Sequence, residues 1–327
     1  MKIGICLLNM GGPASLEDVR PFLFNLFSDR EIIELGPRFL QRPIAWLIAK
    51  MRAPKSKENY RLIGGKSPLT DITISQAKAL EGLLNKRIGE GVSIGFVAKV
   101  GMRYWHPRTP KTLMEFKTEG IDKVIGLSLY PHFSRATGGT SLNEFERCAR
   151  DLGLEFVSIK RYPTHPAYIS ALKDVLEEGI NKMGGPPFHL VYSAHSLPER
   201  FIRQGDPYLH DIKATIKALE AQTGIKGTLA FQSRSGPVKW LEPQTDQHLL
   251  ELVAQGKRRI LCLPISFVSD HIETLYEIDM LFKGIVKEAG GELYMTPGLN
   301  TRPSFIEALF QLTQEALSSK GWIEGVS

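Results

Sequence analysis

The sequence contains only three cysteines among its 327 residues, at positions 6, 148 and 262. None of them forms a Cys-x-x-Cys pair, and Cys6 and Cys262 lie in apolar runs, where a thiol acts as a small hydrophobic side chain. An odd count without framework spacing argues against disulfides and favours a reducing compartment. An iron–sulfur cluster ligated by cysteine normally needs four thiolates, so we expect none here.

Long hydrophobic runs are also missing. No apolar stretch approaches the roughly 18 residues needed to span a bilayer. The first eight residues superficially resemble a signal peptide, but their apolar part is short and residues 9–13 (NMGGP) do not form a cleavage site. The net charge of +6 favours a slightly cationic surface over a dedicated binding patch. These features predict a cytoplasmic protein.

Several sequence motifs that are typical of particular catalytic or binding functions are absent. Gly65-Lys66-Ser67 resembles the end of a phosphate-binding loop, but Tyr60 stands where that motif needs its first glycine. No Gly-x-Gly-x-x-Gly follows a strand, so a dinucleotide fingerprint is lacking. The sequence has neither His-Glu-x-x-His nor Gly-x-Ser-x-Gly. Basic residues do not interleave with aromatic ones, so we expect no nucleic-acid partner.

Short apolar runs alternate with helix-like segments along the whole chain. This alternation predicts parallel βαβ units and an α/β fold. The expected strands fall at residues 3–8, 93–101, 123–130, 154–159, 188–194, 227–233, 259–266 and 291–295.

The two sets of four expected strands resemble each other. Pro107 matches Pro243, and residues 123–127 match 259–263, both 136 positions apart. Residues 166–172 match 303–309 at almost the same offset. We infer an internal duplication that gives two similar, Rossmann-like, doubly wound domains, at 1–160 and 161–327, with a ligand-binding cleft between them. The C-terminal helix is free to pack back on the first half.

Two segments of the second half carry titratable side chains directly after buried strands. They are SAHSLP at 193–198 and SDHIETLYEID at 269–279. Parallel strands of one sheet would bring His195 and Glu273 to the same edge, where ligands bind in such folds. An imidazole facing a carboxylate can bind a divalent metal and accept protons. Taken alone, each residue has a plainer interpretation: a strand-end histidine held by backbone, and a carboxylate beside a helix N-terminus.

The segment 21–52 interrupts the alternating pattern. It is rich in Phe and Leu, and it continues through Trp46 to a basic end at Lys50 and Arg52. Such a segment could form a core helix, a lid over the cleft, or a helix that lies at a membrane interface.

Taken together, seven blocks resemble the ferrochelatases (protohaem ferro-lyases), which insert ferrous iron into a porphyrin to make haem. The resemblance covers nearly the whole chain and implies two Rossmann-like halves around a porphyrin cleft. The blocks are LNMGGP at 8–13, IGGKSPL at 63–69, MRYWHP at 102–107, YPHFS at 130–134, SAHSLP at 193–198, QSRSGP at 232–237 with Trp240-Leu241, and 269–279.

The resemblance implies a role for particular residues. His195 and Glu273 would form the catalytic metal-site pair. Around them, Glu277 would belong to a row of carboxylates along the following helix, which Leu281 shortens by replacing the last one. One of Asp270 and His271 would orient a ligand, and the other would cap that helix. The expected porphyrin contacts are Met10, Arg52, Tyr60, Ser67, Arg103 and Trp240.

Met10 also bears on the substrate. Aligning Pro13 with Pro198 places Met10 opposite His195, so only the second half has the titratable group. In the family, enzymes acting on coproporphyrin usually carry a Tyr at this position, so the resemblance implies a bacterial enzyme of the protoporphyrin type. Coproporphyrin, another tetrapyrrole with cobalt or nickel, and a non-catalytic haem carrier remain alternatives.

The resemblance also bears on cofactors and location. It makes Fe²⁺ a substrate, with no cofactor permanently bound. The chain ends at Ser327 without the cysteine-bearing tail of cluster-containing members. We also expect the segment 21–52 to make transient contact with the inner face of the membrane.

Overall fold

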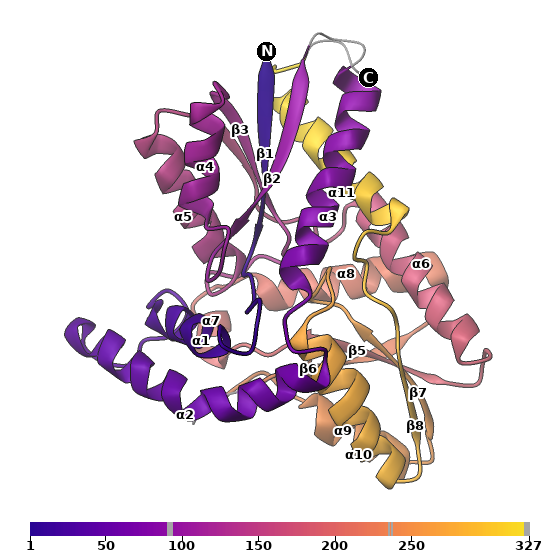
Figure 1. Cartoon of the computed structure of the whole chain (residues 1–327). Helices are drawn as coiled ribbons and strands as arrows, with labels where there is room; N and C mark the ends of the chain where they lie inside the picture. Colours follow the sequence, from indigo (N-terminus) through magenta and orange to yellow (C-terminus); the bar gives the residue numbers. More distant parts are fainter. Residues whose placement is uncertain (90–93, 235, 237, 324–327) are drawn as a thin grey trace. The chain divides into compact units, whose positions relative to one another are not determined.

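The computed structural model describes residues 1–89, 94–234, 236 and 238–323 (Figure 1). Ser235 and Pro237 of the 232–237 block, and residue 93 of one expected strand, lie outside the described residues. The chain forms two compact units. The first comprises Met1–Tyr162 with Asn300–Ser327, and the second comprises Pro163–Leu299.

The first unit contains a four-stranded parallel sheet in the order β2-β1-β3-β4. Its strands are β1 (Lys2–Asn9), β2 (Gly95–Met102), β3 (Lys123–Ser128) and β4 (Glu155–Ile159). All residues of β1 except Lys2 are buried, because helices cover both faces of the sheet. This explains why the sequence shows a continuous apolar run rather than alternation.

Helices pack on both faces of this sheet (Figure 1). On one face, α4 (Thr109–Thr118) and α5 (Gly138–Asp151) enclose a core that includes Cys6, Phe116 and Phe145. Gly126 is required there, because a Cβ atom at that position would lie 2.5 Å from the Phe145 ring. On the other face lie α3 (Leu69–Leu84), followed by the short π-helix η2 (Asn85–Gly89), and α11 (Pro303–Ser319).

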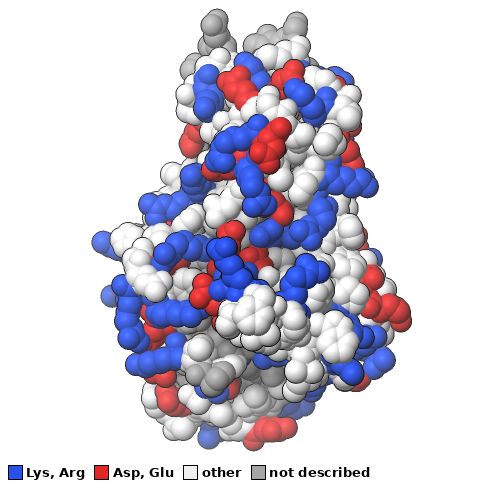
Figure 2. All heavy atoms as spheres, turned by 90° about the vertical axis from the view of Figure 1, so that its left-hand side faces the viewer, with Lys and Arg blue, Asp and Glu red and all other residues white. Residues whose placement is uncertain are grey.

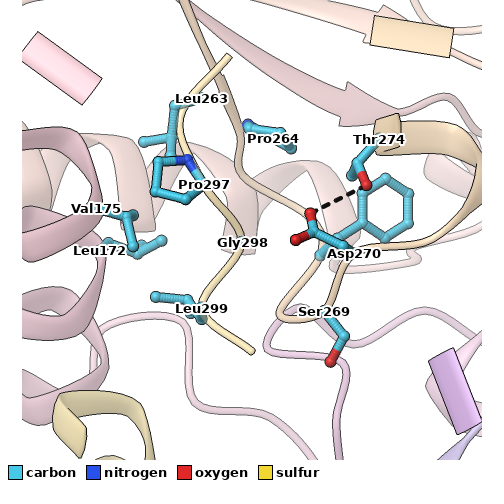
Figure 3. Close-up of a pocket in the computed structure, with 11 residues that line it drawn as sticks. Leu172, Val175, Leu263, Pro264, Ser269, Asp270, Thr274, Pro297, Gly298 and Leu299 are labelled. Atoms are coloured by element: carbon cyan, nitrogen blue, oxygen red, sulfur yellow. Dashed lines mark hydrogen bonds between the residues drawn. The ribbon is translucent and has the colours of Figure 1, made fainter. Parts of the chain in front are cut away.

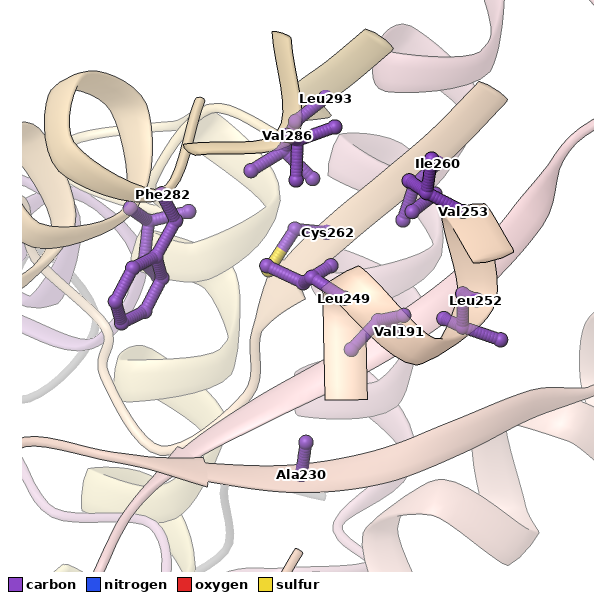
Figure 4. Packing of buried hydrophobic residues seen from close by; sticks show 11 residues of the cluster. Val191, Ala230, Leu249, Leu252, Val253, Ile260, Cys262, Phe282, Val286 and Leu293 are labelled. Carbon is purple, nitrogen blue, oxygen red and sulfur yellow. The ribbon is translucent and has the colours of Figure 1, made fainter. Parts of the chain in front are cut away.

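The second unit repeats this arrangement with strand order β6-β5-β7-β8. Its strands are β5 (His189–His195), β6 (Gly227–Gln232), β7 (Arg259–Pro264) and β8 (Glu292–Met295). One face carries α9 (Thr245–Ala254), the π-helix η3 (Glu273–Phe282) and α10 (Lys283–Glu288). Their side chains close the core shown in Figure 4, where Leu249, Phe282 and Val286 surround Cys262. Three further helices are α6 (Pro166–Lys182), which packs on α8 (Tyr208–Thr223), and α7 (Glu199–Arg203).

The repeated strand order confirms the predicted fold class and its duplication. Leu8 pairs with Ser128 in the first sheet, and Ser193 pairs with Pro264 in the second. The two central strands therefore correspond, and Met10 and His195 each follow two residues later. All eight expected strands are present, with ends within two residues of prediction. The predicted run at 123–130 is longer than β3, because residues 129 and 130 have already left the sheet.

The irregular segment after β1 forms α1 (Val19–Ser28), the 3-10 turn η1 (Arg38–Leu40) and α2 (Gln41–Leu62). Helix α2 buries Ala45, Ala49 and Ala53 on the side that contacts α1. Trp46 and Met51 project outward and are 48% and 72% exposed. A core helix would bury these side chains. The interpretation of the segment as a core helix is therefore wrong for the outer face of α2.

A candidate metal centre in the second unit

His195 is the last residue of β5, and its backbone is fixed from both sides. Its N–H donates to Ser266 Oγ at 2.9 Å, and its carbonyl accepts a hydrogen bond from Tyr208 OH at 2.9 Å. The imidazole therefore leaves the edge of the sheet in a defined direction.

The ring of His195 has a defined tautomer when it is neutral. Its Nδ1 lies 2.6 Å from the carbonyl oxygen of Ser196, and a carbonyl can only accept. Nδ1 therefore carries the hydrogen, and the lone pair is on Nε2. That nitrogen lies 3.6 Å from Oε2 of Glu273.

His271 faces the same carboxylate oxygen from the other side. Its Nδ1 lies 3.1 Å from the Ser269 carbonyl, and its Nε2 lies 3.7 Å from Glu273 Oε2. The ring is buried and packs edge-on against Phe267, with 4.2 Å between centroids. Among the described residues, His271 Nε2 and Glu273 Oε2 belong to the few buried polar atoms without a hydrogen-bond partner. Buried polar atoms normally have partners, and a metal ion held between these side chains would provide one.

The spacing is suited to an ion between the side chains. Two ligands that each lie about 2.1 Å from a tetrahedral metal are roughly 3.4 Å apart. The distances of 3.6 and 3.7 Å are close to this value. Within residues 1–89, 94–234, 236 and 238–323, no group of three or more His, Cys, Asp or Glu has the geometry of a metal site. The candidate ligand set is therefore the pair His195 and Glu273.

The electrostatics keep Glu273 ionised. Burial raises the pKa of its carboxyl, but the charge of His195 and the contacts with His271 and Ser233 lower it further, to about 2. An anionic carboxylate beside an imidazole lone pair is a suitable donor set for a divalent transition metal.

The next carboxylate along η3 is held by hydrogen bonds. Ser233 donates its N–H to Glu277 Oε1 at 2.9 Å and its hydroxyl to Oε2. Ser233 has a φ of 65°, in the left-handed region, and in this conformation both its donors reach one carboxylate. Burial and the charge of Glu273 raise the pKa of Glu277. The row ends at Leu281, which is exposed, while Asp279 turns away and pairs with Lys283 at 3.0 Å.

The end of β6 supplies residues to which the sequence analysis gave no role. Gln232 Nε2 donates to the Glu273 carbonyl at 2.9 Å, and its Oε1 accepts a hydrogen bond from Ser193 at 2.5 Å. Gln232 and Ser233 lie in the QSRSGP block, but nothing in that block indicates that β6 neighbours β5. Gln232 and Ser233 reach the site because β6 lies next to β5 in the sheet.

One expectation for this region is wrong. Asp270 does not cap η3, because the N-cap residue is Ile272 and no side chain makes a capping bond there. Asp270 instead accepts a hydrogen bond from Thr274 Oγ1 at 3.2 Å.

Comparison with known proteins identifies this arrangement. A model of the ferrochelatase family matches residues 2–317. The chain belongs to the ferrochelatase family. It is 48% identical over 315 residues to the ferrochelatase of Desulfotalea psychrophila, covering 96% of this chain and 97% of that one. It is 49% identical to that of Geotalea daltonii (96% and 97% covered), and 44% identical to that of a Picosynechococcus species (97% and 83%).

Solved structures of chelatases share the fold. The sirohydrochlorin chelatase SirB from Bacillus subtilis subspecies spizizenii, in complex with cobalt, aligns with a TM-score of 0.55 over 98% of both chains. CbiX, the terminal enzyme of sirohaem biosynthesis in denitrifying bacteria, aligns with a TM-score of 0.53 over 97% of this chain and all of that one. At 12% identity these likenesses show the chelatase fold alone.

Four of the porphyrin contacts expected for a ferrochelatase lie in the first unit. Met10 follows β1, and Ser67 docks beside it, with its N–H donating to the Pro13 carbonyl at 2.9 Å. The approach is so close that a Cβ atom on Gly12 would lie 2.4 Å from the Ser67 side chain. Tyr60 is buried at the end of α2, and the Arg52 guanidinium lies 5.4 Å from the centre of the Phe27 ring.

Trp240 is the expected contact in the second unit. It pairs with Pro198 in an isolated bridge, which places it beside the SAHSLP segment of this ferrochelatase. Its indole Nε1 is buried and, within the part of the chain that the structure describes, has no hydrogen-bond partner.

Arg103 has a different environment from the one expected of a propionate ligand. Its two terminal nitrogens bind Glu144 at 2.5 Å and Asp29 at 2.6 Å, and all three side chains are largely buried. Tyr104 adds a hydrogen bond to Asp29 at 2.9 Å. Asp29 follows the last residue of α1, so this network ties α1 to the end of β2. The geometry favours a structural role for Arg103 over substrate binding.

Arg103→Met should therefore reduce the stability of the ferrochelatase by about 3–5 kcal/mol, because it removes the cation that the buried carboxylates of Asp29 and Glu144 share. Arg203→Met, which removes an exposed partner of Glu199, should cost about 1 kcal/mol or less. Urea unfolding measures both. Unchanged stability together with weaker porphyrin binding would instead place Arg103 at the substrate.

Proposed function

We propose that this chain inserts Fe²⁺ into protoporphyrin IX to form protohaem, with release of two protons, and that His195 and Glu273 act directly on iron and on the pyrrole protons. Family membership supports the reaction. The observation that supports the residues is the lone pair of His195 Nε2, held 3.6 Å from an ionised, unpartnered carboxylate oxygen.

Metallation has physical requirements that these groups fit. The pyrrole N–H groups must lose two protons, and the ferrous ion must exchange water ligands for macrocycle nitrogens. A neutral imidazole is a common proton acceptor in catalysis. Nδ1–H of His195 is already bound to a carbonyl, so protonation at Nε2 requires no ring reorientation. The adjacent Glu273 carboxylate stabilises the resulting imidazolium.

Glu273 is the better placed iron ligand of the pair. Oxygen and imidazole nitrogen donors both suit Fe²⁺, and a two-residue set leaves coordination positions for water and for the porphyrin nitrogens. Glu277 would take up protons that leave the site, because burial and the charge of Glu273 raise its pKa above that of an ordinary carboxyl.

Five residues are the proposed porphyrin contacts. The guanidinium of Arg52 suits a propionate, since its planar fork matches a carboxylate. Ser67 and Tyr60 are donors for the other propionate. Met10 and Trp240 are apolar surfaces for the macrocycle, and Trp240 also offers its unpaired N–H.

His195→Ala should lower iron insertion by about 10²–10⁴-fold, the usual contribution of a general base, while porphyrin affinity changes little. Glu273→Gln should cause a comparable loss, because the amide keeps the shape and removes the charge. Glu277→Gln is the matched control, since it makes the same change four residues along η3, and it should cost less. Anaerobic mixing with Fe²⁺, followed by the porphyrin absorbance bands, measures turnover.

The same assay separates the alternatives. A haem carrier would bind protohaem but show no insertion. A chelatase for another tetrapyrrole would insert cobalt or nickel into its own substrate and leave protoporphyrin unchanged. Near wild-type insertion by Glu273→Gln would refute the role of this pair.

Protoporphyrin IX should be preferred over coproporphyrin by about tenfold or more in kcat/KM. Coproporphyrin carries two further propionates, whose buried charges would need donors. Met10 at the end of β1 is apolar and supplies none. Parallel assays with both porphyrins test this, and Met10→Tyr should move the ratio toward coproporphyrin. A wild-type preference for coproporphyrin would contradict the proposal.

We further propose that the outer face of α2, with η1, makes transient contact with an anionic bilayer. Phe39, Trp46 and Met51 are exposed. Helix α2 contains six Lys and Arg and one Glu, so its charge of +5 nearly equals that of the whole chain, +6. Lys50 and Arg20 lie against the Trp46 ring, at 5.3 and 5.0 Å from its centroid.

This mixture of apolar and basic side chains fits lipid headgroups. Figure 2 faces the side of the view on which α1 and α2 lie, and Lys and Arg are intermingled there with uncharged side chains. Each basic residue near an anionic surface contributes about 1 kcal/mol to binding. Protoporphyrin IX is sparingly soluble, so collection from lipid would supply the substrate. None of the helices in the described residues could cross a membrane. The proposed location is thus the cytoplasmic face of the membrane, by peripheral contact.

Co-sedimentation with vesicles tests this contact. The wild type should bind vesicles that contain anionic lipid and lose binding at high salt. Trp46→Glu should bind at least tenfold more weakly, since it removes an apolar anchor and adds a negative charge. Met114→Glu is the control, because Met114 is equally exposed on α4. Equal, negligible binding by all three proteins would exclude a membrane role for α2.

A further inference from the structure

The first turn of η3 is organised by Thr274, which is buried. Its Oγ1 accepts the N–H of His271 at 3.1 Å. A side chain near the start of a helix that accepts the N–H of a residue before the helix stabilises the first turn, as the reciprocal bond of a capping box does. The hydroxyl hydrogen faces two acceptors, Asp270 Oδ1 at 3.2 Å and the His271 carbonyl at 3.1 Å. One hydroxyl therefore joins Asp270 and His271, which lie before η3, to its first turn.

Asp270 in turn lies directly against the backbone of Gly298, in the loop that follows β8. A Cβ atom added to Gly298 would lie 2.8 Å from Asp270 Oδ1 and 2.9 Å from Oδ2. Figure 3 shows Asp270 between Thr274, to which it is hydrogen bonded, and the loop segment at Pro297 and Gly298. The φ angle of Gly298 is outside the left-handed region, so its backbone does not require glycine. Glycine is required at this position only because Asp270 leaves no room for a side chain.

The residues held by this support are the ones that face the candidate metal position. Glu273 lies between His271 and Thr274 in the sequence, and its Oε2 lies 3.6 Å from His195 and 3.7 Å from His271. Gln232 holds the Glu273 carbonyl from the opposite side, at 2.9 Å. Without Thr274 Oγ1, the His271 N–H would lose its partner, and the first turn of η3 would be held only by the hydrogen bond from Gln232 to the Glu273 carbonyl.

We propose that Thr274, Asp270 and Gly298 form a support that sets the position of Glu273 and His271 relative to His195, with Thr274 and Gly298 as positioning residues for iron. The proposal rests on the proposed function of Glu273. Groups that orient a metal ligand typically change metal affinity or activity by about 10–100-fold when they are removed. The porphyrin contacts lie on other elements, so the support should affect iron selectively.

Two substitutions test the support in different ways. Thr274→Val keeps the shape and removes the hydroxyl, and it should raise the KM for Fe²⁺ by about tenfold or more, with the KM for protoporphyrin unchanged. Thr274→Ser retains the hydroxyl and should restore the wild-type KM. Gly298→Ala leaves the hydroxyl in place but displaces Asp270, and it should raise the KM for Fe²⁺ in the same direction.

Matched controls exclude a general loss of stability. Gly284→Ala adds a methyl group at a helical site with open space around it. Thr313→Val removes a buried hydroxyl from α11 in the first unit, where it donates to Leu309 O at 2.7 Å. Both variants should leave the two KM values unchanged, and thermal midpoints are measured for every variant.

The outcomes separate this inference from the proposed function. If Glu273→Gln is inactive and Thr274→Val raises both KM values equally, or only lowers the thermal midpoint, the support has no specific role and the inference fails. If Glu273→Gln remains active, the proposed function of the pair fails first. Direct binding of Co²⁺ to the porphyrin-free protein gives a second readout. Thr274→Val should weaken it about tenfold in the wild-type background and have no further effect in Glu273→Gln.

Discussion

The placement of His195 Nε2 opposite Glu273 Oε2 is the arrangement on which the rest of the site depends. It requires that the strand end be rigid, that the imidazole use Nδ1 for a backbone carbonyl, and that the carboxylate remain unpaired although it is largely buried. An unpaired buried carboxylate is unfavourable unless opposite charge or hydrogen bonds compensate. The charge that the imidazoles on either side carry when they are protonated provides that compensation, and it lowers the pKa of Glu273 to about 2 despite burial.

The duplicated fold supplies two equivalent strand ends and places chemistry at only one of them. In the first unit the position holds Met10, and in the second it holds His195. The same sheet order, β2-β1-β3-β4 and β6-β5-β7-β8, fixes where each side chain leaves its sheet. Because the scaffold is common to both units, the difference between a thioether and an imidazole is enough to place a side chain that can bind metal and exchange protons in only one of them.

The site is held by groups that themselves take no part in the proposed reaction. Gln232 and Ser233 approach η3 from the end of β6, and Thr274 and Asp270 hold its first turn. A π-helix of ten residues is unusual, since such helices mostly occur as single turns. Here two side chains hold its first turn: Gln232 donates to the Glu273 carbonyl, and Thr274 accepts the His271 N–H.

The sequence by itself determined the eight strands, the duplication and the pairing of His195 with Glu273, because these depend on local apolar runs and on the rule that parallel strands end at one edge. It did not determine the partners of Arg103, since the positions of Asp29 and Glu144 beside it result from how α1 and α5 pack on the sheet. Likewise, apolar composition alone could not tell that Trp46 faces outward, because small alanines on the opposite side of α2 already form its buried face. The contributions of Ser233 and Gly298 became recognisable only in the tertiary structure. Ser233 forms a hydrogen bond with Glu277, 44 positions away in the sequence, and Asp270 leaves no room for a side chain at Gly298.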